Sequence, residues 1–568
     1  MQLTRLPVRV RPVEGEAIDS WLEATARQMD LSLSSLAKML QLSVEERSCW
    51  HIWISPAQRR AIGIATGTSA DSIGSMTLSD YDGRALRLDP VTREIDPAFP
   101  YGALRWSRYC PHCLSDSQDR WQIRWRLGWS FACLEHNVLL LDACPTCHAR
   151  PRRRQTFRGR PEPGLCNCGY RLNDAPTSSM ESNDPILEAQ RTVADVSARN
   201  PAGPALLQAA SIRDKLEAIR SISNRVLNYA SWHGMAAVEG VELPVPLVTG
   251  GGEQKPSRAR GAMNSDPPTR AIEAAVGVTA ALSILAAPTV VEAGMRARWL
   301  IRGQNADTGP AELRSCSQDN GVATAIVIKA STERLGPELQ LRYRSGSAVP
   351  SAPNFHLDDV TRIARALPRM MWTTWSDQLL VGLPSTTEMR SALSIATLLI
   401  GSSVRAVEAG DILGEAASAN ALNQRLWLLC GSRQWSSIYA RLIRLSDYLN
   451  RYGGPIDYGR RRALNYSSLL GDRDWQIVCG EAGLNLAQSA SATWARKRLV
   501  ETISGGPATP TLLGRSASKV HTNAVDPAVL SALAGPLEDY AKRFLRQMGI
   551  DEPVEWSPLP QNCCHYGT

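Results

Sequence analysis

Two groups of cysteine and histidine residues have the spacing of paired metal-binding knuckles. The first group joins Cys110-Pro-His-Cys113 to Cys133-Leu-Glu-His136 across nineteen residues. The second joins Cys144-Pro-Thr-Cys147 to Cys166-Asn-Cys168 across eighteen residues. A tight turn presents two ligands to one ion, and two such turns complete a tetrahedron around zinc. We therefore predict two structural Zn2+ ions, whose ligands are Cys110, Cys113, Cys133, His136, Cys144, Cys147, Cys166 and Cys168.

Other cysteines and histidines near these groups are interpreted as spare ligands. Sites with three or four thiolates are closed shells, which makes the predicted ions structural rather than catalytic. His112 and His148 lie inside or beside knuckles, and His148 could substitute if the short loop from Cys166 cannot chelate. The C-terminal cluster could also bind metal, but we assign it to a disordered tail; its residues are Cys563, Cys564 and His565.

Basic residues concentrate on two segments of a chain whose net charge is only +8 over 568 residues. Residues 101–170 hold eleven Lys or Arg against five Asp or Glu, and residues 441–500 hold ten against five. Such a surplus is typical of a phosphate-facing surface, although a solvated basic loop or helix face has the same composition. The predicted DNA-contacting residues are Arg150, Arg152, Arg153, Arg154, Arg158, Arg160, Arg460, Arg461, Arg462, Arg496, Lys497 and Arg498.

The sequence lacks the common local signatures of catalysis. It contains no Gly-Lys dipeptide, and therefore no phosphate-binding Walker loop. None of its eight histidines is followed by Glu, and no Gly-x-Ser-x-Gly elbow is present. We predict that the protein is not an enzyme and has no catalytic residue. The alternative is a zinc-dependent enzyme that acts on DNA, which would need an open metal position beside an acid such as Glu135.

Helical patterns precede the ligand groups. The apolar spacing in residues 14–45 predicts two short helices. A helix that begins at Pro56, a turn at Gly67 and a second helix capped by Ser69 form a candidate helix-turn-helix motif over residues 56–77. An ordinary helical hairpin fits these residues equally well.

A tryptophan-rich segment lies between the knuckles of the first group. The run Ser115-Asp116-Ser117-Gln118 predicts a capping box and a helix that continues through Arg126. This helix would carry Trp121 and Trp125 on one face, with Trp129 just beyond its end. We interpret the three tryptophans as the core of a small zinc module rather than as a platform for stacking bases.

The predicted fold class is mainly α and multidomain, with an N-terminal helix-turn-helix domain, a tandem zinc ribbon or knuckle module and a C-terminal helical DNA-binding region. One short hairpin is expected, from strands at Thr324–Lys329 and Glu338–Tyr343. The predicted divisions are 1–100, N-terminal helical; 101–180, zinc module; 181–243, helical segment; 244–269, flexible linker; 270–504, C-terminal helical region; and 505–568, linker and tail.

No segment has the pattern of an export signal or a membrane span. The arginines near the N-terminus are not followed by an apolar stretch. Residues 271–291 are apolar but include Glu273 and Pro288, which favours a buried helix. We therefore expect a cytoplasmic, nucleoid-associated protein.

An ordered set of motifs resembles the TniQ family, also called TnsD, of transposon target-site selection proteins. These motifs are Val13-Glu14-Gly15-Glu16, Ser20-Trp21-Leu22, Arg124-Trp125-Arg126-Leu127, Leu139-Leu140-Leu141-Asp142 and Cys144-Pro-Thr-Cys147. The resemblance covers about residues 5–175, and the last knuckle departs from the family pattern because it is Cys-x-Cys. The resemblance implies a protein that recognises an insertion site and recruits an AAA+ ATPase regulator of the TnsC or TniB type, which engages the transposase.

The length of the chain bears on how the target is chosen. Nearly 400 residues follow the zinc module, which favours a protein that binds double-stranded DNA itself. The best candidate for a DNA reader in that part is Pro455–Gly480, together with the basic run that begins at Arg496. The alternatives are an adaptor carried to its target by a CRISPR guide-RNA effector complex and a zinc-containing transcription regulator.

Overall fold

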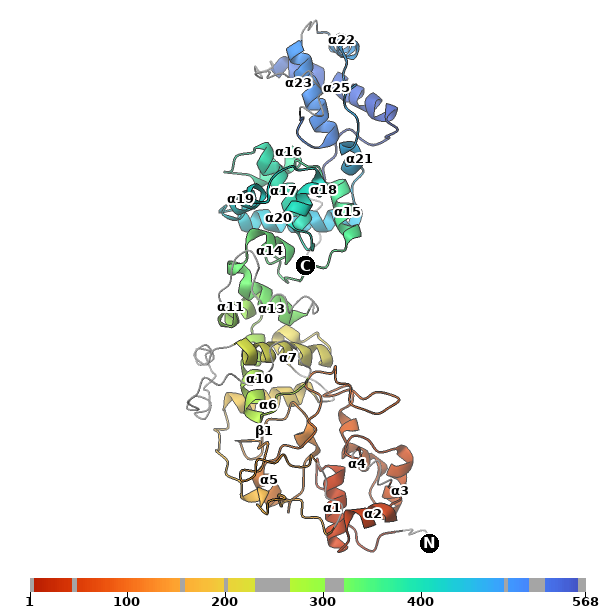
Figure 1. The fold of residues 1–568 in the computed structure, drawn as a ribbon, viewed down its shortest axis with the longest axis vertical. Coiled ribbons are helices and arrows are strands. Elements are labelled where there is room, and N and C mark those ends of the chain that lie inside the picture. Colours follow the sequence, from red (N-terminus) through yellow and green to blue (C-terminus); the bar gives the residue numbers. More distant parts are fainter. Residues whose placement is uncertain are drawn as a thin grey trace. The chain divides into compact units, whose positions relative to one another are not determined.

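The computed structural model describes residues 5–42, 49–153, 159–198, 203–229, 266–301, 321–484, 489–509 and 527–559. The chain divides into two compact units, coloured along the sequence in Figure 1. Unit 1 comprises Met1–Arg302 and Gly321–Ile326, and unit 2 comprises Gly303–Asn320 and Val327–Thr568. Helices dominate the described part of both units, which confirms the predicted mainly helical class.

Unit 1 contains short helices and one two-stranded sheet. Its α-helices are α1 (Ile18–Gln28), α2 (Leu33–Met39), α3 (Pro56–Thr66), α4 (Ala70–Ser75), α5 (Pro111–Asp116), α6 (Pro185–Val196), α7 (Ile212–Tyr229), α10 (Ala271–Leu285) and α11 (Val290–Arg296). Its 3-10 turns are η2 (Leu78–Tyr81), η3 (Ile123–Arg126), η4 (Leu172–Asp174), η5 (Ala205–Leu207) and η6 (Arg298–Leu300). Strands β1 (Ala132–Cys133) and β2 (Val138–Leu139) pair antiparallel.

The predicted helical pair at residues 56–77 is present. Ser55 and Gln58 form a capping box at the start of α3, and Gly67 ends the helix in the left-handed conformation with φ 71°. Ser69 then caps α4 by accepting a hydrogen bond from the Ser72 N–H. Apolar residues of α1 to α4 form one core. Glycine suits the αL position between the helices because it has no Cβ.

The predicted helix from Ser115 through Arg126 is wrong. Helix α5 begins earlier, at Pro111, and ends at Asp116. Gln118 and Asp119 have positive φ, and the chain reverses there. The reversal lets the Trp121 carbonyl accept a hydrogen bond from the Ala17 N–H at 2.8 Å. Long-range pairing with the start of α1 therefore replaces the local capping signal.

Helices α6, α7 and α10 pack together in unit 1. Helix α6 lies within the predicted helical segment 181–243, and α10 packs against α7 and α6. The structure thus places residues 271–302 with unit 1, whereas the predicted boundary lay at residue 270. Most of the predicted linker at 244–269 lies outside the described residues. Within the described residues, no helix is both long and apolar enough to cross a membrane.

The predicted hairpin at residues 323–344 is wrong, because both strands are helices. Residues 322–331 form α13 (Val322–Ser331), and residues 337–342 form α14 (Pro337–Arg342). The apolar run in α13 is buried on all sides, and a short run of that kind has no periodicity that separates strand from helix. Pro337 occupies the first turn of α14, where proline favours a helix.

Unit 2 is helical and has two apolar cores. Its further elements are η7 (Thr332–Arg334), α15 (Leu357–Ala366), α16 (Thr373–Leu379), α17 (Thr387–Leu399), α18 (Ala406–Leu413), α19 (Ala419–Cys430), α20 (Trp435–Tyr452), α21 (Tyr458–Arg462), α22 (Asp472–Glu481), α23 (Ser489–Ser504) and α25 (Pro527–Gln547). The first core draws on residues 341–458 and the second on residues 466–554.

The segment predicted as a linker and tail, residues 505–568, contains the longest described helix. Helix α25 buries Leu533, Leu537, Ala541 and Phe544 in the second core, at helical spacing. Residues after it return to α16, where the Trp375 indole N–H donates to the Pro558 carbonyl at 2.8 Å. The tail interpretation is therefore wrong for the described residues. The C-terminal Cys563, Cys564 and His565 lie outside them.

Candidate metal centres

The first ligand group is assembled by α5 and the β1–β2 hairpin. Cys110 directly precedes α5, Cys113 lies in the first turn of that helix, and Cys133 ends β1 just before the turn that carries His136. The Cys113 and Cys133 sulfurs are 3.5 Å apart, and the His136 Nδ1 lies 3.3 Å from the Cys113 sulfur. Zinc bonds of about 2.3 Å to sulfur and 2.0 Å to nitrogen give tetrahedral edges of about 3.5–3.8 Å. The spacing therefore fits one zinc ion.

A carboxylate supports this group from outside. The His136 Nε2 lies 2.9 Å from the Asp116 Oδ2, which leaves Nδ1 directed at the sulfurs. A second partner of this kind fixes the ring orientation of a metal-binding histidine. This role of Asp116 was not predicted, because the run from Ser115 to Gln118 has the pattern of a capping box. Its position in α5, three residues after Cys113, is the signal that could have identified it.

The four cysteines of the second ligand group also come together around one point, although the last knuckle is shorter. The Cys144 and Cys168 sulfurs are 3.7 Å apart, and those of Cys147 and Cys166 are 3.5 Å apart. All four sulfurs lie within 4.8 Å of one another. Gly169 makes the Cys-x-Cys turn possible, with φ 87° and an N–H that donates to the Cys166 carbonyl at 2.8 Å. Each of the two predicted sets thus has a geometry that could hold a metal ion.

The spare histidines take no ligand position. The His112 Nε2 lies 2.9 Å from the Thr177 hydroxyl. His148 is exposed and is not part of the group of four sulfurs beside it. Because Cys166 and Cys168 both reach the second group, substitution by His148 is unnecessary.

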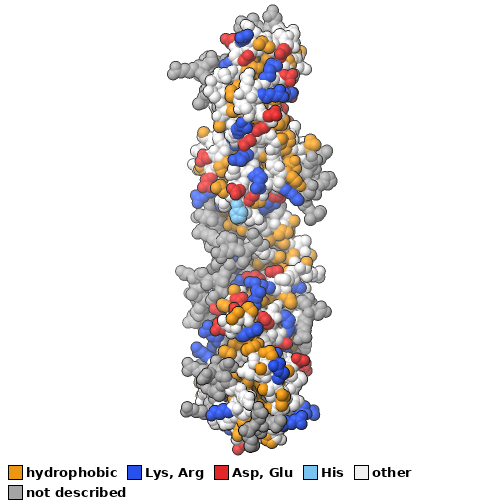
Figure 2. Space-filling model, turned by 90° about the vertical axis from the view of Figure 1, so that its right-hand side faces the viewer, with side chains coloured by type: hydrophobic (Ala, Val, Ile, Leu, Met, Phe, Trp, Pro, Cys, Tyr) orange, Lys and Arg blue, Asp and Glu red, His pale blue; other side chains and the backbone are white. Residues whose placement is uncertain are grey.

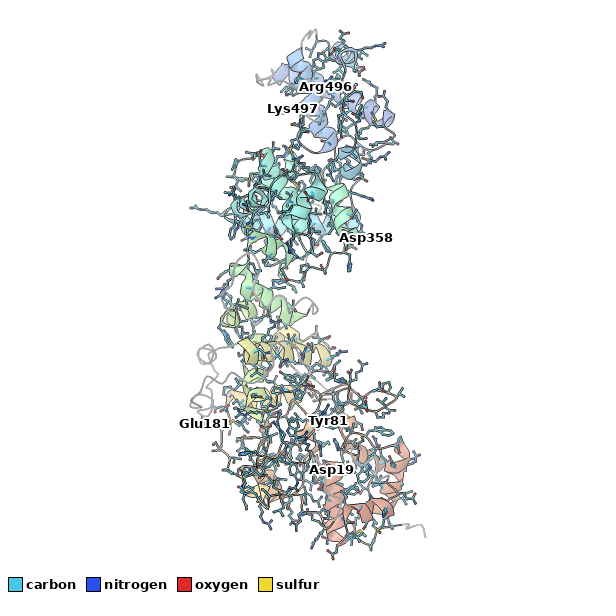
Figure 3. All side chains as sticks on the ribbon, viewed as in Figure 1. Asp19, Tyr81, Glu181, Asp358, Arg496 and Lys497 are labelled. Carbon is cyan, nitrogen blue, oxygen red and sulfur yellow. The ribbon has the colours of Figure 1, made fainter. Side chains whose placement is uncertain are left out.

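Buried charges join α1 to the segment that carries the ligands. The carboxylates on one face of α1 and just before it are Glu16, Asp19 and Glu23, and their partners are Arg120, Arg126 and Arg152. We call these six residues the α1 charge cluster. Spacings of three, four and seven residues place the three acids on one side of a helix. The Asp19 position is labelled in Figure 3.

Asp19 is the centre of this cluster. Its Oδ2 accepts from Arg126 at 2.9 Å and from Arg152 at 2.8 Å, and its residue is 1% exposed. Burial alone would raise the pKa of Asp19, but the charges of Arg152 and Arg126 hold it well below its ordinary value. Burial raises the pKa of Glu23, although Arg152 contacts it. The Asp19 carboxylate is therefore ionised beside two guanidinium groups.

The same cluster gives a physical reason for the sequence motifs before α1. Gly15 has φ 70°, and a Cβ there would lie 2.4 Å from the Gln122 Oε1. Glu16 accepts two hydrogen bonds from the Arg120 guanidinium, at 2.9 and 2.8 Å. The Ser20 hydroxyl donates to Glu16 and accepts from the Trp121 N–H. The Gly-Glu and Ser-Trp positions thus form the joint between α1 and the segment near the ligands.

The three tryptophans of this segment are core residues, as predicted. Trp121, Trp125 and Trp129 are each 2% exposed or less. Trp121 and Trp125 meet edge to face with ring centroids 5.7 Å apart, and the Arg152 guanidinium lies 4.8 Å from the Trp121 ring. In this fold their faces are not open to a nucleic-acid base.

The structure separates the basic residues of the first segment into different environments. Arg152 belongs to the α1 charge cluster, and its burial there contradicts its predicted DNA contact. Arg150 stacks 4.0 Å from the Trp106 ring and donates to the Thr269 carbonyl. Arg153 and Arg160 are exposed. The remaining two, Arg154 and Arg158, lie outside the described residues.

The C-terminal basic run at α21 is divided in the same way. Arg461 is fully buried, pairs with Glu552 and donates to the Pro553 and Val554 carbonyls, which contradicts its predicted DNA contact. Arg462 is half-buried and donates to the carbonyls that end α15. Arg460 is exposed, although one nitrogen donates to the Gly549 carbonyl at 2.8 Å.

The predicted basic run on α23 is more accessible. Arg496 is half-buried and donates to the Leu470 carbonyl, whereas Lys497 and Arg498 are exposed. Arg496 and Lys497 are labelled on this helix in Figure 3. Figure 2 shows Lys and Arg side chains interspersed with Asp and Glu on the face that it draws. The accessible cations are therefore local groups and do not cover that face.

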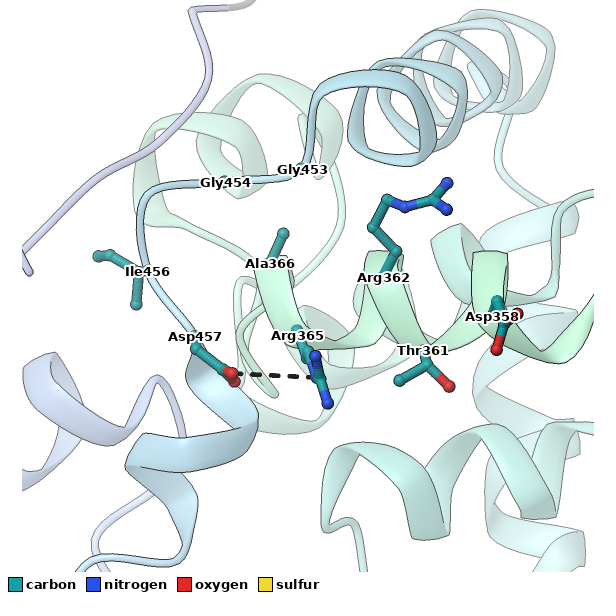
Figure 4. Close-up of a pocket in the computed structure, with 9 residues that line it drawn as sticks. All are labelled: Asp358, Thr361, Arg362, Arg365, Ala366, Gly453, Gly454, Ile456 and Asp457. Atoms are coloured by element: carbon teal, nitrogen blue, oxygen red, sulfur yellow. Dashed lines mark ion pairs between the residues drawn. The ribbon is translucent and has the colours of Figure 1, made fainter.

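A hollow of about 440 Å3 lies between α15 and the segment after α20 (Figure 4). Arg362 and Arg365 line it together with Asp358 and Asp457. The Arg365 and Asp457 charges are 3.9 Å apart. Because the lining charges balance, this hollow has no surplus attraction for a phosphate.

The described geometry defines a class of protein in which buried charges join a helical domain to a module with two sets of thiolate-rich ligands. Residues 7–140 match the TniQ family model, so the chain carries a TniQ domain and the resemblance to that family is confirmed. A TniQ domain indicates a protein associated with transposition. The match includes the first ligand group and ends before Cys144. No curated protein matches the chain.

Proposed function

We propose that this protein is a non-enzymatic transposition factor that selects an insertion site by binding double-stranded DNA. In this proposal it recruits an AAA+ ATPase regulator, and through it the transposase. The TniQ domain is the observation that carries the proposal. The six-residue charge cluster supports it, since it holds α1 to α4 and the ligand groups as one body that a partner protein could dock onto.

Two zinc ions would act as structural elements of this body. Residues Cys110, Cys113, Cys133 and His136 would hold one, and Cys144, Cys147, Cys166 and Cys168 the other. Both ligand sets supply four protein donors, which fits a closed structural site. Bound zinc would supply folding free energy to a module whose described part has only one two-stranded sheet.

An enzymatic role has weak support at the same place. The Glu135 carboxylate lies 3.0 Å from the Arg124 guanidinium, and its side chain is 63% exposed. A zinc hydrolase needs an open coordination position and a shielded acid beside it. Four protein donors around each ion position leave no room for such chemistry.

The proposed DNA contacts are the exposed members of the basic groups. In unit 1 they are Arg153 and Arg160, and in unit 2 they are Arg460, Lys497 and Arg498. Flexible cations of this kind contact backbone phosphates, which position a protein without reading sequence. Sequence choice would then come from other side chains or from a guide-RNA effector complex, which is the alternative form of the proposal.

A binding assay with salt titration tests the DNA contacts. We expect Lys497→Ala combined with Arg498→Ala to weaken binding to genomic fragments. The slope of log K against log salt should fall by about 0.9 for each phosphate that the variant no longer neutralises. The matched control is Arg191→Ala, which removes a partly exposed arginine of α6 outside both basic groups. Equal slopes for the double variant and the control would contradict the assignment. Binding that requires co-purified RNA would favour the guide-RNA alternative.

A further inference from the structure

The first ligand group is shielded from solvent. Cys110, Cys113 and Cys133 are 0%, 6% and 2% exposed. The one half-buried ligand, His136, is held by the Asp116 carboxylate. Thiolates react with oxidants and electrophiles only where these molecules can reach the sulfur. This group is therefore protected by its own packing.

The second ligand group is open to solvent. Cys147 and Cys168 are exposed and Cys166 is half-buried, so that Cys144 alone is buried. A Cβ built on Gly169, directly after the last ligand, would meet no atom within 4 Å. With four thiolates the site would carry more negative charge than one with three thiolates and an imidazole. The group therefore combines two exposed cysteines with an electron-rich set of sulfurs.

The segment after Cys147 is hydrogen-bonded directly to other parts of unit 1. We call residues 149–153 the arginine strap. The Cys144 N–H donates to the Ala149 carbonyl at 3.0 Å, and the Ser107 N–H donates to the Pro151 carbonyl at 3.1 Å. Further along the strap, Arg152 pairs with Asp19. The knuckle at Cys144 therefore fixes the start of the segment that carries a central arginine of the α1 charge cluster.

We propose that the second ligand group is a peroxide-sensitive metal site, and that its oxidation releases the arginine strap while the first group stays closed. The inference rests on the proposed occupation of both groups by zinc. The reactant is a hydroperoxide of the simplest class, hydrogen peroxide. The geometry points to this group because two of its four cysteines are exposed and a third is half-buried, whereas the three cysteines of the first group are buried.

The reaction balances with one peroxide for each pair of sulfurs. An exposed thiolate attacks one peroxide oxygen and the O–O bond breaks. The sulfur becomes a sulfenic acid, and the other oxygen departs as hydroxide. A second thiolate attacks that sulfur, a disulfide forms, and a second hydroxide leaves. Two thiolates are oxidised by two electrons, one peroxide is reduced, and the two hydroxides take up protons to give water. The sulfurs of Cys147 and Cys166, 3.5 Å apart, are one such pair.

Peroxide titration of the zinc-loaded full chain tests the proposal. Metal release is followed with a chromogenic zinc chelator, and oxidised cysteines are mapped by differential alkylation and mass spectrometry. We expect one zinc equivalent to leave at least tenfold faster than the other, with oxidation confined to the second group. Hydrogen exchange should increase at the Ser107 amide while residues 132–139 stay protected.

Several outcomes would overturn this inference. The first is an equal release rate for the two ions. The second is oxidation that begins at Cys110, Cys113 or Cys133. The third is an unchanged hydrogen exchange rate at the Ser107 amide after the first ion has left. Fewer than two zinc equivalents in the untreated protein would instead contradict the proposed function, so that the two failures are distinguishable.

Two variants sharpen the test. Cys147→Ser should hold one zinc, lack the fast phase and show the increased Ser107 exchange without peroxide. Cys479→Ser is the matched control, because it removes a buried thiol of unit 2 that belongs to neither group. It should keep both phases of release. If it loses the fast phase, the reactive thiol is not in the second group and the proposal fails.

Discussion

The buried Asp19 carboxylate should contribute to the stability of unit 1 through its two charged hydrogen bonds. It accepts hydrogen bonds from two guanidinium groups at 2.9 and 2.8 Å, and Arg126 and Arg152 have side-chain exposures of 2% and 7%. Hydrogen bonds to charged groups contribute about 1.5–3 kcal/mol each, and breaking a buried ion pair costs about 3–5 kcal/mol. Asn keeps one neutral acceptor, so we expect Asp19→Asn to cost about 3 kcal/mol.

Hydrogen exchange of peptides from residues 16–28, measured in a series of urea concentrations, reports this free energy locally. A local probe is needed because a chain of two units does not unfold in one two-state step. The matched control is Glu188→Gln, which breaks an exposed 3.1 Å pair with Arg191 on α6 and should cost less than about 0.5 kcal/mol. If Asp19→Asn costs no more than this control, the reasoning about the charge cluster is refuted.

The pH dependence of this difference has a definite sign. The pKa of Asp19 is lowered from 3.8 by its arginine partners, so its contribution is fully present above about pH 4 and is lost as the pH falls further. The free-energy difference between the wild type and Asp19→Asn should therefore be constant from about pH 8 to about pH 5. A difference that shrinks within this range would contradict the assigned ionisation.

Three other changes test the rest of unit 1. Cys110→Ser should leave one zinc equivalent by elemental analysis and expose the β1–β2 amides to exchange, because metal binding is folding energy there; two retained equivalents would contradict the ligand assignment. Burial and the charge of Arg126 lower the pKa of His51 from 6.5 to about 3. The folded protein therefore favours the neutral imidazole, and the contribution of His51 to stability is complete above pH 6.5 and is lost as the pH falls. Between about pH 7 and pH 5 the free energy of unfolding of the wild type should fall by about 1–2 kcal/mol more than that of His51→Gln, after allowance for partial exposure. The control His356→Gln, which changes an exposed histidine, should show the same fall as the wild type. Gly15→Ala should lower the local free energy of unfolding by about 1–2 kcal/mol because of its positive φ, as measured by hydrogen exchange of the surrounding peptides in urea. Gly535→Ala in α25, measured in the same way, should be neutral or stabilising, and the same effect at both sites would argue against strain at Gly15.

Local signals in the sequence predicted what local chemistry determines. The ligand spacing predicted both groups, and the capping and glycine positions predicted α3 and α4. The predictions for two helical segments were wrong for opposite reasons. The capping box at Ser115 was a valid local signal, but pairing of Trp121 with Ala17 across the fold overrode it. Helix α25 was missed although its apolar spacing is regular.

Basic residues could be counted from the sequence, but their partners could not be identified. Arg152 meets Asp19 across 133 positions, and Arg461 meets Glu552 across 91. A count of charges in a segment gives the number of cations but does not show which distant carboxylates neutralise them. For that reason the predicted DNA-contacting set mixed exposed residues, such as Lys497, with interior ones. Asp116 was missed for the same reason, since its role depends on where the β1–β2 turn places His136.

The α1 charge cluster has a practical consequence for work with fragments of this chain. A truncated protein that begins at residue 101 would keep Arg120, Arg126 and Arg152 and lose every carboxylate that neutralises them. Three uncompensated guanidinium groups would attract any polyanion, heparin as readily as DNA. Such a fragment would bind nucleic acid more tightly than the intact chain does, so affinities should be measured with α1 present.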